Sequence, residues 1–300
     1  DNTIGPAYLY YGNRYCNGWV WVEVLAQRQG LTYDSSKNLS YFGHYSANLV
    51  ANVNQFSATD ASTSLFVVWV NDADFVWGME HINPLTDGNQ WNNLVNSSLA
   101  NHQTAIQTLY AKGARTLILP NAADITRVPY YPGLAQTPAD KRFIRQRVVA
   151  FNTGFAAMLN QARASLPGVK IYLPDLFALF DNMVAYPGDY GLINVTSDAI
   201  DDGYTALNGP GANYLFWDYQ DPTAKGQAVI ADVVQQMISP AKITNLTLLN
   251  GSNRLDVVNI PIGLNGSVEG RTNLVLGSWT SVTNFNSTSG TQTIFVPASG

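Results

Sequence analysis

Residues 64–70 read Ser-Leu-Phe-Val-Val-Trp-Val, an unbroken apolar run. Such a run predicts a strand that is buried on both faces, as strands of parallel sheets are. Residues 115–120 and 169–173 have the same character farther along the chain. Apolar residues at helical spacing surround these runs and predict helices over residues 19–29, 94–112, 140–166 and 224–238. Strands that alternate with helices indicate an α/β domain with a parallel sheet.

The pattern changes near Pro240. From residue 243 onward the helical period is absent, and short β-type runs recur at residues 243–249, 254–260, 266–269, 279–284 and 291–296. Asn-Gly and Gly-Ser pairs between several of these runs favour tight turns. We therefore predict two domains, an α/β domain over residues 1–240 and a small β-sandwich-like module over residues 243–300.

The composition indicates a globular protein with an unusually uncharged surface. Charged residues make up 12% of the 300 residues, against about 25% in a typical soluble domain, whereas hydrophobic residues reach 46%. Uncharged polar surfaces are common in extracellular proteins and in subunits of assemblies, so we expect a secreted or cell-surface protein. The net charge of −5 and the absence of a long basic run argue against nucleic acid as a partner. The densest basic segment, residues 141–147, is interpreted as an exposed helix face rather than a phosphate site.

No stretch of the sequence predicts a membrane span, because none approaches the ~20 apolar residues that cross a bilayer. The chain begins with Asp1 instead of methionine, which we take to indicate processing or truncation upstream. It contains seven Asn-x-Ser/Thr sequons, and those beyond residue 240 are the better candidates for glycosylation.

Cysteine and histidine are scarce. Cys16 is the only cysteine, so an intrachain disulfide is impossible. The three histidines, His44, His81 and His102, lack the spacing of a metal site, and we expect neither a metal nor a cofactor. We expect His81 in a loop, His102 on a helix and His44 nearest to any site, because it follows Gly43.

Residues 11–26 read Tyr-Gly-Asn-Arg-Tyr-Cys-Asn-Gly-Trp-Val-Trp-Val-Glu-Val-Leu-Ala. This segment resembles the stretch that follows the nucleophile in SGNH/GDSL ester hydrolases, of the form Tyr-Gly-x-Arg-x-x-Asn-Gly-x-Val-Trp-Val-Glu-x-Leu-Ala. Further blocks that resemble the family follow in the family's order at residues 38–46, 68–72, 151–169, 186–196 and 217–223. The resemblance runs through most of residues 10–238. It implies an SGNH-like three-layer α/β/α fold with a parallel sheet.

The resemblance also implies a site. In this family a glycine N–H and an asparagine amide stabilise the oxyanion, and Gly43 and Asn71 match them, although a gapless alignment places Ala73 at the asparagine position. The last family block has the form Asp-x-x-His-Pro-Thr, in which the aspartate orients the histidine that activates the serine. Asp218 matches the orienting acid, and Asp221 stands where the histidine is expected.

The Gly-Asp-Ser-type turn that carries the family's nucleophile is not found in the chain. In one alignment residues 12–14 occupy this turn, and Arg14 replaces the serine. In the other, which we favour because Tyr11 already matches the segment after the turn, the block precedes Asp1. A domain without that first strand would have an open slot in its sheet, with unpaired backbone groups.

Asp221 has two interpretations. A carboxylate with an ordinary pKa near 4 is a poor base for a serine hydroxyl, although the nearby Asp218 could raise that pKa. Alternatively, Asp221 is the N-cap of the last helix, with Pro222 at the first helical position. We favour the cap.

The resemblance and the composition together lead us to expect an SGNH/GDSL-like extracellular protein. As this chain stands, we expect it to be catalytically inactive and to act as a structural, assembly or binding subunit. Its partner would be a second copy of the chain, joined by exchange of the strand at residues 291–296, or a glycan or cell surface. One alternative is a serine ester hydrolase for acyl or acetyl esters, with its nucleophile upstream of residue 1. Another is a carbohydrate-binding protein that uses residues 250–284 and the tyrosines.

Overall fold

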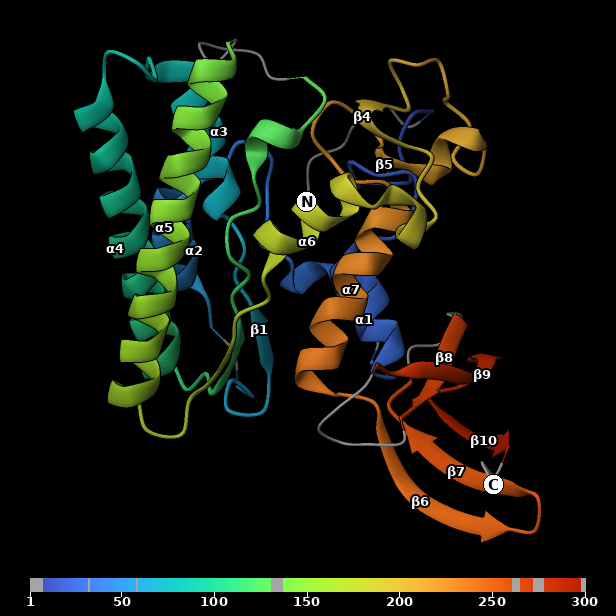
Figure 1. The fold of residues 1–300 in the computed structure, drawn as a ribbon. Coiled ribbons are helices and arrows are strands. Elements are labelled where there is room, and N and C mark those ends of the chain that lie inside the picture. The colour runs from blue at the N-terminus through green and yellow to red at the C-terminus, as the bar shows by residue number, and fades with distance from the viewer. Residues whose placement is uncertain are drawn as a thin grey trace. The chain divides into compact units, whose positions relative to one another are not determined.

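The computed structural model describes residues 8–31, 33–57, 59–130, 137–260, 265–271 and 278–297, and Figure 1 shows its ribbon. The chain divides into two compact units, one of residues 1–21 and 34–230 and the other of residues 22–33 and 231–300. Asp1, where the predicted upstream block would join, lies outside the described residues.

The first unit contains a parallel sheet with the strand order β1-β2-β3, made of β1 (Leu65–Val67), β2 (Thr116–Ile118) and β3 (Lys170–Tyr172). Phe66 pairs with Leu117, and Leu117 pairs with Ile171, so the three strands align at their midpoints. Two further strands, β4 (Asn194–Asp198) and β5 (Tyr214–Phe216), form a separate parallel pair. Helices and parallel strands confirm the predicted α/β class.

The described α-helices are α1 (Trp21–Arg28), α2 (Ser46–Gln55), α3 (Asn71–His81), α4 (Gly88–Ala111), α5 (Pro138–Ser165), α6 (Leu176–Ala185) and α7 (Ala224–Ile238). Four of them, α1, α4, α5 and α7, confirm the helices that apolar periodicity predicted. In Figure 1, α2, α4 and α5 lie together on one side of β1. Short 3-10 helices complete the chain: η1 (Ser35–Lys37), η2 (Ile125–Arg127), η3 (Pro187–Tyr190) and η4 (Pro210–Asn213). No helix in the described ranges is both long and apolar enough to cross a bilayer.

The start of α5 is fixed by its own side chains. Thr137 is the N-cap, and its hydroxyl accepts a hydrogen bond from the Asp140 N–H at 3.2 Å. The Asp140 carboxylate accepts in return from the Thr137 N–H at 2.9 Å, while Pro138 occupies the first helical position. This reciprocal capping box holds the helix end in place.

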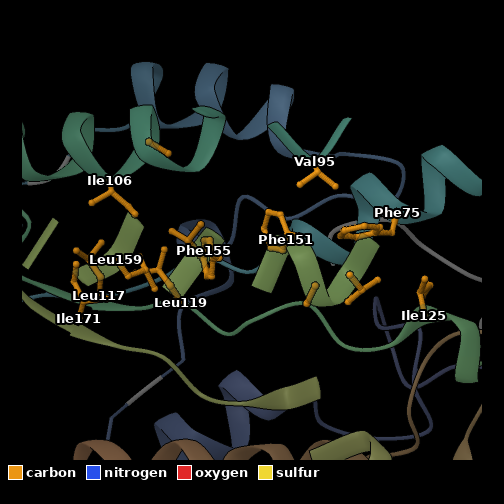
Figure 2. Close-up of a cluster of buried hydrophobic side chains, with 14 of the residues drawn as sticks. Phe75, Val95, Ile106, Leu117, Leu119, Ile125, Phe151, Phe155, Leu159 and Ile171 are labelled. Carbon is orange, nitrogen blue, oxygen red and sulfur yellow. The ribbon is translucent and has the colours of Figure 1, made fainter. Parts of the chain in front are cut away.

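The main core joins the sheet to α3, α4 and α5 (Figure 2). Phe151 and Phe155 of α5 stack with their ring centroids 5.2 Å apart, and Phe75 of α3 meets Phe151 edge to face at 5.7 Å. Leu117 and Leu119, from β2 and the residues after it, are fully buried in the same cluster. Aromatic pairs of this kind stabilise a core by about 0.5–1.5 kcal/mol beyond the area they bury.

β1 differs from the prediction of a strand buried on both faces. Its Leu65 and Val67 side chains are 36% and 38% exposed, whereas Leu117 and Ile118 of β2 are fully buried. These side chains are exposed because β1 lies at the edge of the sheet and pairs with β2 along one side only. Among the described residues no strand pairs with its other edge, so the backbone groups along this edge of the sheet are open, and the internal slot stays a prediction.

The C-terminal segment is antiparallel, and each of its five strands falls on a predicted run. β7 (Ser252–Val258) lies between β10 (Thr291–Pro297) and β6 (Lys242–Leu249), and β8 (Asn265–Gly270) pairs with β9 (Thr280–Asn286). The buried side chains of β7 and β10 form a cluster against which Val268 and Phe285 pack. Since β10 pairs with β7 of its own chain, the predicted exchange of residues 291–296 gains no support from this strand.

The second unit also takes in residues 22–33 and the end of α7, which the predicted boundary at residue 240 did not include. Arg28 of α1 forms an ion pair with Asp232 of α7, and this contact joins the two helices within the unit. Sequence periodicity shows two separate helices here but not their pairing.

Candidate functional site

The turn after β5 holds Asp218, whose carboxylate is 4% exposed. Its Oδ1 atom accepts from the backbone N–H groups of Gln220 at 3.0 Å and Asp221 at 2.7 Å. The Tyr10 hydroxyl donates to Oδ2 at 2.8 Å. Burial raises the Asp218 pKa, and these donors partly offset that effect because they favour the carboxylate. Asp218 is therefore a fixed, buried acceptor.

Asp221 lies against Asp218 and holds a proton more firmly than an ordinary carboxyl does. Burial and the negative charge of Asp218 raise the Asp221 pKa well above its usual value. The two acids form a coupled pair in which Asp221 holds a proton more readily than Asp218 does. A protonated carboxyl donates a hydrogen bond and does not act as a base.

The prediction that Asp221 caps the last helix is wrong. α7 begins at Ala224, and the Thr223 hydroxyl accepts from the Gly226 N–H at 3.3 Å as an N-cap does. The Asn17 side chain accepts from the Ala224 N–H at 2.7 Å and completes the cap. Pro222 lies outside the helix, because it bridges to Phe216 in an extended segment. The helix therefore starts later than the Asp-Pro pair suggested.

Residues near the N-terminus pack against this turn. Tyr10 packs in one buried cluster with Tyr214 and Trp217, and the Trp217 indole N–H donates to the Leu9 carbonyl at 2.7 Å. Burial and the charge of Asp218 raise the Tyr10 pKa, so its hydroxyl remains a donor. Sequence reasoning did not identify Tyr10 as part of the site, because its contact with Asp218 spans 208 residues of chain.

Aromatic side chains connect this turn to Gly43. The ring of Tyr15 lies 5.1 Å from that of Tyr10, and the ring of Phe42 lies 5.5 Å from that of Tyr15. Gly43 follows Phe42 with a φ of 77°, a left-handed conformation that favours glycine. A Cβ atom at this position would meet no neighbour within 4 Å. A series of ring contacts through Tyr10, Tyr15 and Phe42 thus runs from Asp218 to the residue before Gly43, whose role in an oxyanion hole stays a prediction.

Asn71 lies at the start of α3 and is fully buried. Its Nδ2 atom donates to the Pro120 carbonyl at 2.9 Å and so links the chain after β1 to the chain after β2. Its Oδ1 atom has no partner among the described residues. One amide hydrogen of Asn71 is therefore engaged in the structure, and the role in an oxyanion hole stays a prediction.

Two acids beside Asn71 were not identified from the sequence. Asp72 accepts from the Ala123 N–H at 2.7 Å, and burial raises its pKa to about 8. Asp74 is 2% exposed and accepts from both the N–H and the hydroxyl of Ser46, at 3.1 and 2.9 Å, and from the Ser98 hydroxyl at 2.6 Å. The only signal in the sequence was the Asn-Asp pair that follows the strand.

Each of the three histidines lies against an aromatic ring. His102 is fully buried beside Phe155, at 5.3 Å between rings, and burial lowers its pKa to about 4. His81 stacks on Trp77 at 4.7 Å as the last residue of α3, so its predicted loop position is wrong. His44 lies 5.2 Å from the ring of Tyr41. Within the described ranges none of the three has a recorded contact with Asp218.

The residues that could carry other chemistry are also engaged or buried. The Arg14 guanidinium lies 5.3 Å above the Tyr11 ring and donates to the Tyr11 carbonyl at 3.2 Å. Cys16 is free and fully buried, and burial raises its pKa to about 12. The described part of the chain contains no group of three or more His, Cys, Asp or Glu side chains that could hold a metal ion.

Comparison with known proteins identifies relatives of this chain. The family model for the GDSL-like lipase/acylhydrolases matches residues 7–234. The thermolabile hemolysin of Vibrio parahaemolyticus is 25% identical over 244 residues, which are 74% of this chain and 55% of that protein. The GDSL esterase/lipases 6 and 7 of Arabidopsis thaliana are 24% and 27% identical, over 43% and 42% of this chain and 39% and 38% of their own lengths.

The chain spans about half the length, or less, of these relatives. The family match itself takes in more than half of the chain, and it includes Tyr10, Gly43, Asn71, Asp218 and Asp221. The protein therefore belongs to the GDSL-like lipase/acylhydrolase family.

Proposed function

We propose that this chain is a GDSL-type scaffold that acts as a binding or structural subunit and does not itself hydrolyse esters by a serine–histidine mechanism. The observation that carries the proposal is the pair of neighbouring carboxyls, Asp218 and Asp221, at the positions of the family's aspartate and histidine, with Asp218 already accepting from the Tyr10 hydroxyl and from the N–H groups of Gln220 and Asp221. A general base must be deprotonated and must have a free acceptor atom near the nucleophile. Asp221, whose raised pKa favours the protonated carboxyl, does not meet the first requirement.

The surroundings of Asp218 support the same proposal. In the family mechanism this acid accepts a hydrogen bond from the histidine and stabilises its positive charge. Here its oxygens already accept from Tyr10, from Gln220 and from Asp221. The carboxyl pair thus serves as a structural connection between the N-terminal residues and the last turn of the domain.

The proposal also places the protein outside the cell, in an assembly or at a glycan surface. It is supported by the low share of charged residues, 12%, and by the exposure of the sequon residues Asn245, Asn250 and Asn286. For the architecture we propose three α/β/α layers. For the C-terminal strands we propose a sandwich, because Val268 and Phe285 pack on the cluster formed by β7 and β10.

A second candidate is an ester hydrolase whose nucleophile lies outside residues 1–300. The observation that favours it is the family match, since the relatives named above include GDSL esterase/lipases. In that case the open edge of β1 is where the strand that carries the nucleophile would pair.

Hydrolysis of p-nitrophenyl acetate distinguishes the two candidates. We expect the chain, and its Asp221→His variant, to show no saturable turnover above the slow reaction of free imidazole, because the part of the chain that the structure describes holds no serine beside the histidine. The matched comparison uses the chain extended by the residues encoded upstream. Its activity is measured with and without a Ser→Ala change at each upstream serine. Turnover by the extended chain that disappears with one Ser→Ala change would establish the hydrolase and end the first proposal.

A further inference from the structure

A cavity of about 370 Å³ opens where η2 follows β2 and α5 begins. Its lining residues are Asp124, Thr126, Arg127, Pro138, Lys141, Arg142 and Arg145. Four of these seven side chains are cationic, in a chain with only 16 lysines and arginines and a net charge of −5. Residues 141–147 lie on helix α5 with Lys141 and Arg142 exposed, as predicted, and this cavity adds a second feature to that helix face.

Two of the four cations are held by acids. Arg145 pairs with both Asp124 and Asp181, and its guanidinium lies 4.5 Å above the Phe177 ring. Arg127 donates from Nε to Asp181 at 3.2 Å. Two arginines and two aspartates balance in charge, so this cluster forms a fixed wall of the cavity.

The other two cations have no such compensation. Lys141 and Arg142 are exposed, and neither side chain has a hydrogen bond or an ion pair with any residue that the structure describes. The neighbouring Asp140 is buried, and its carboxylate accepts from the N–H and hydroxyl of Thr137 at 2.9 and 2.7 Å. Among the residues that line the cavity, Lys141 and Arg142 are thus two cations without an acid partner, and the Asp140 carboxylate is not part of the lining.

We propose that this cavity binds a phosphate group. A phosphate monoester carries about two negative charges at neutral pH, which matches the two cations without an acid partner. Guanidinium groups donate two parallel hydrogen bonds to phosphate oxygens, and lysine adds a point charge. The cavity lies within the ~300–1,000 Å³ range of small-molecule sites, so it has room for the phosphate and part of its carrier.

The place of the cavity in the fold suits a ligand site. It lies beyond the carboxyl end of β2, the side on which parallel α/β sheets bind ligands. The Tyr130 N–H, three residues after Arg127, approaches the Tyr219 carbonyl at 3.5 Å and so connects this loop to the Asp218–Asp221 turn. The proposal does not depend on whether the chain hydrolyses esters.

Calorimetric titration of the full chain with glycerol 3-phosphate tests the proposal, with glycerol as the uncharged control. We expect saturable 1:1 binding of the phosphate ester that the Lys141→Gln/Arg142→Gln variant weakens at least ~tenfold. The matched variant is Lys37→Gln/Lys170→Gln, which removes the same charge from exposed positions outside the cavity and should bind as the parent does. Circular dichroism verifies that both variants remain folded.

Vesicles distinguish a lipid headgroup from a soluble carrier. Cosedimentation with phosphatidylcholine vesicles that contain phosphatidate is compared with pure phosphatidylcholine vesicles, again with both double variants. Binding to the vesicles alone assigns the site to a lipid headgroup, and binding of glycerol 3-phosphate assigns it to a soluble ester. Absence of both, or equal weakening in the two double variants, would overturn the proposal.

Discussion

The coupling between Asp218 and Asp221 makes this carboxyl pair sensitive to pH. The Asp221 pKa is raised well above its value in the unfolded chain, so the folded state binds the proton more tightly. The free energy of unfolding therefore falls as the pH rises from about 4, the unfolded pKa, toward the folded pKa. The contribution of this carboxyl pair to the free energy of unfolding is therefore smaller at neutral pH than in acid.

We predict that Asp221→Asn stabilises the protein at pH 8, because the amide can still donate a hydrogen bond but never ionises. A higher free energy of unfolding and a higher Tm than those of the parent are therefore expected at pH 8. The difference between variant and parent should shrink toward pH 4.5. Thermal unfolding followed by circular dichroism measures it, with Asp60→Asn at an exposed position as the control. An equal gain from the control would contradict the explanation.

At the scale of the elements, β1 and β2 should respond differently when threonine replaces one of their aliphatic residues. Val67 of β1 is 38% exposed, whereas Ile118 of β2 is fully buried. We predict that Val67→Thr changes the free energy of unfolding by less than about 0.5 kcal/mol. Ile118→Thr should lower it by about 2–4 kcal/mol, because a hydroxyl replaces a buried ethyl group. Urea unfolding of both variants is the measurement, and similar losses in the two would show that β1 is covered.

How much of the fold the sequence predicts depends on how local the signal is. β2 and α5 were predicted because their apolar residues repeat within the element itself. β4 was missed, since Asn194–Asp198 reads Asn-Val-Thr-Ser-Asp, and α3 was missed because it starts with the polar pair Asn71-Asp72. In the site, motif order identified Asp218 and Asp221. The bonds from Tyr10 to Asp218 and from the Ala224 N–H to Asn17 were not predictable, because each joins residues more than 200 positions apart.

At the scale of the whole molecule, buried acids should set the pH range of stability. Burial raises the pKa of Asp72 to about 8 and that of Asp232 to about 6, and it also raises those of Asp74 and Asp198. A carboxyl whose pKa is higher in the folded than in the unfolded chain lowers the free energy of unfolding as the pH rises between these two pKa values. His102, with a pKa lowered to about 4, acts in the opposite sense only between about pH 4 and 6.5.

We therefore predict that the free energy of unfolding decreases from pH 6.5 to pH 8.5. Asp72→Asn should flatten this dependence, since Asp72 has its pKa within that interval. Urea unfolding at both pH values, on the parent and the variant, gives the two slopes. A parent whose stability is constant or rises over this interval would contradict the prediction.

Cys16 can serve as a probe of local opening of the fold. It is the single thiol of the chain, it is fully buried, and its pKa of about 12 keeps it unreactive in the closed state. A disulfide reagent such as dithionitrobenzoate can therefore modify it only when the segment next to Asn17 and α7 opens. The labelling rate under native conditions then reports the opening free energy of this region without any denaturant. Asn17→Ala, which removes the cap on Ala224, should accelerate the labelling several-fold, whereas Asn92→Ala on the remote helix α4 should leave the rate unchanged.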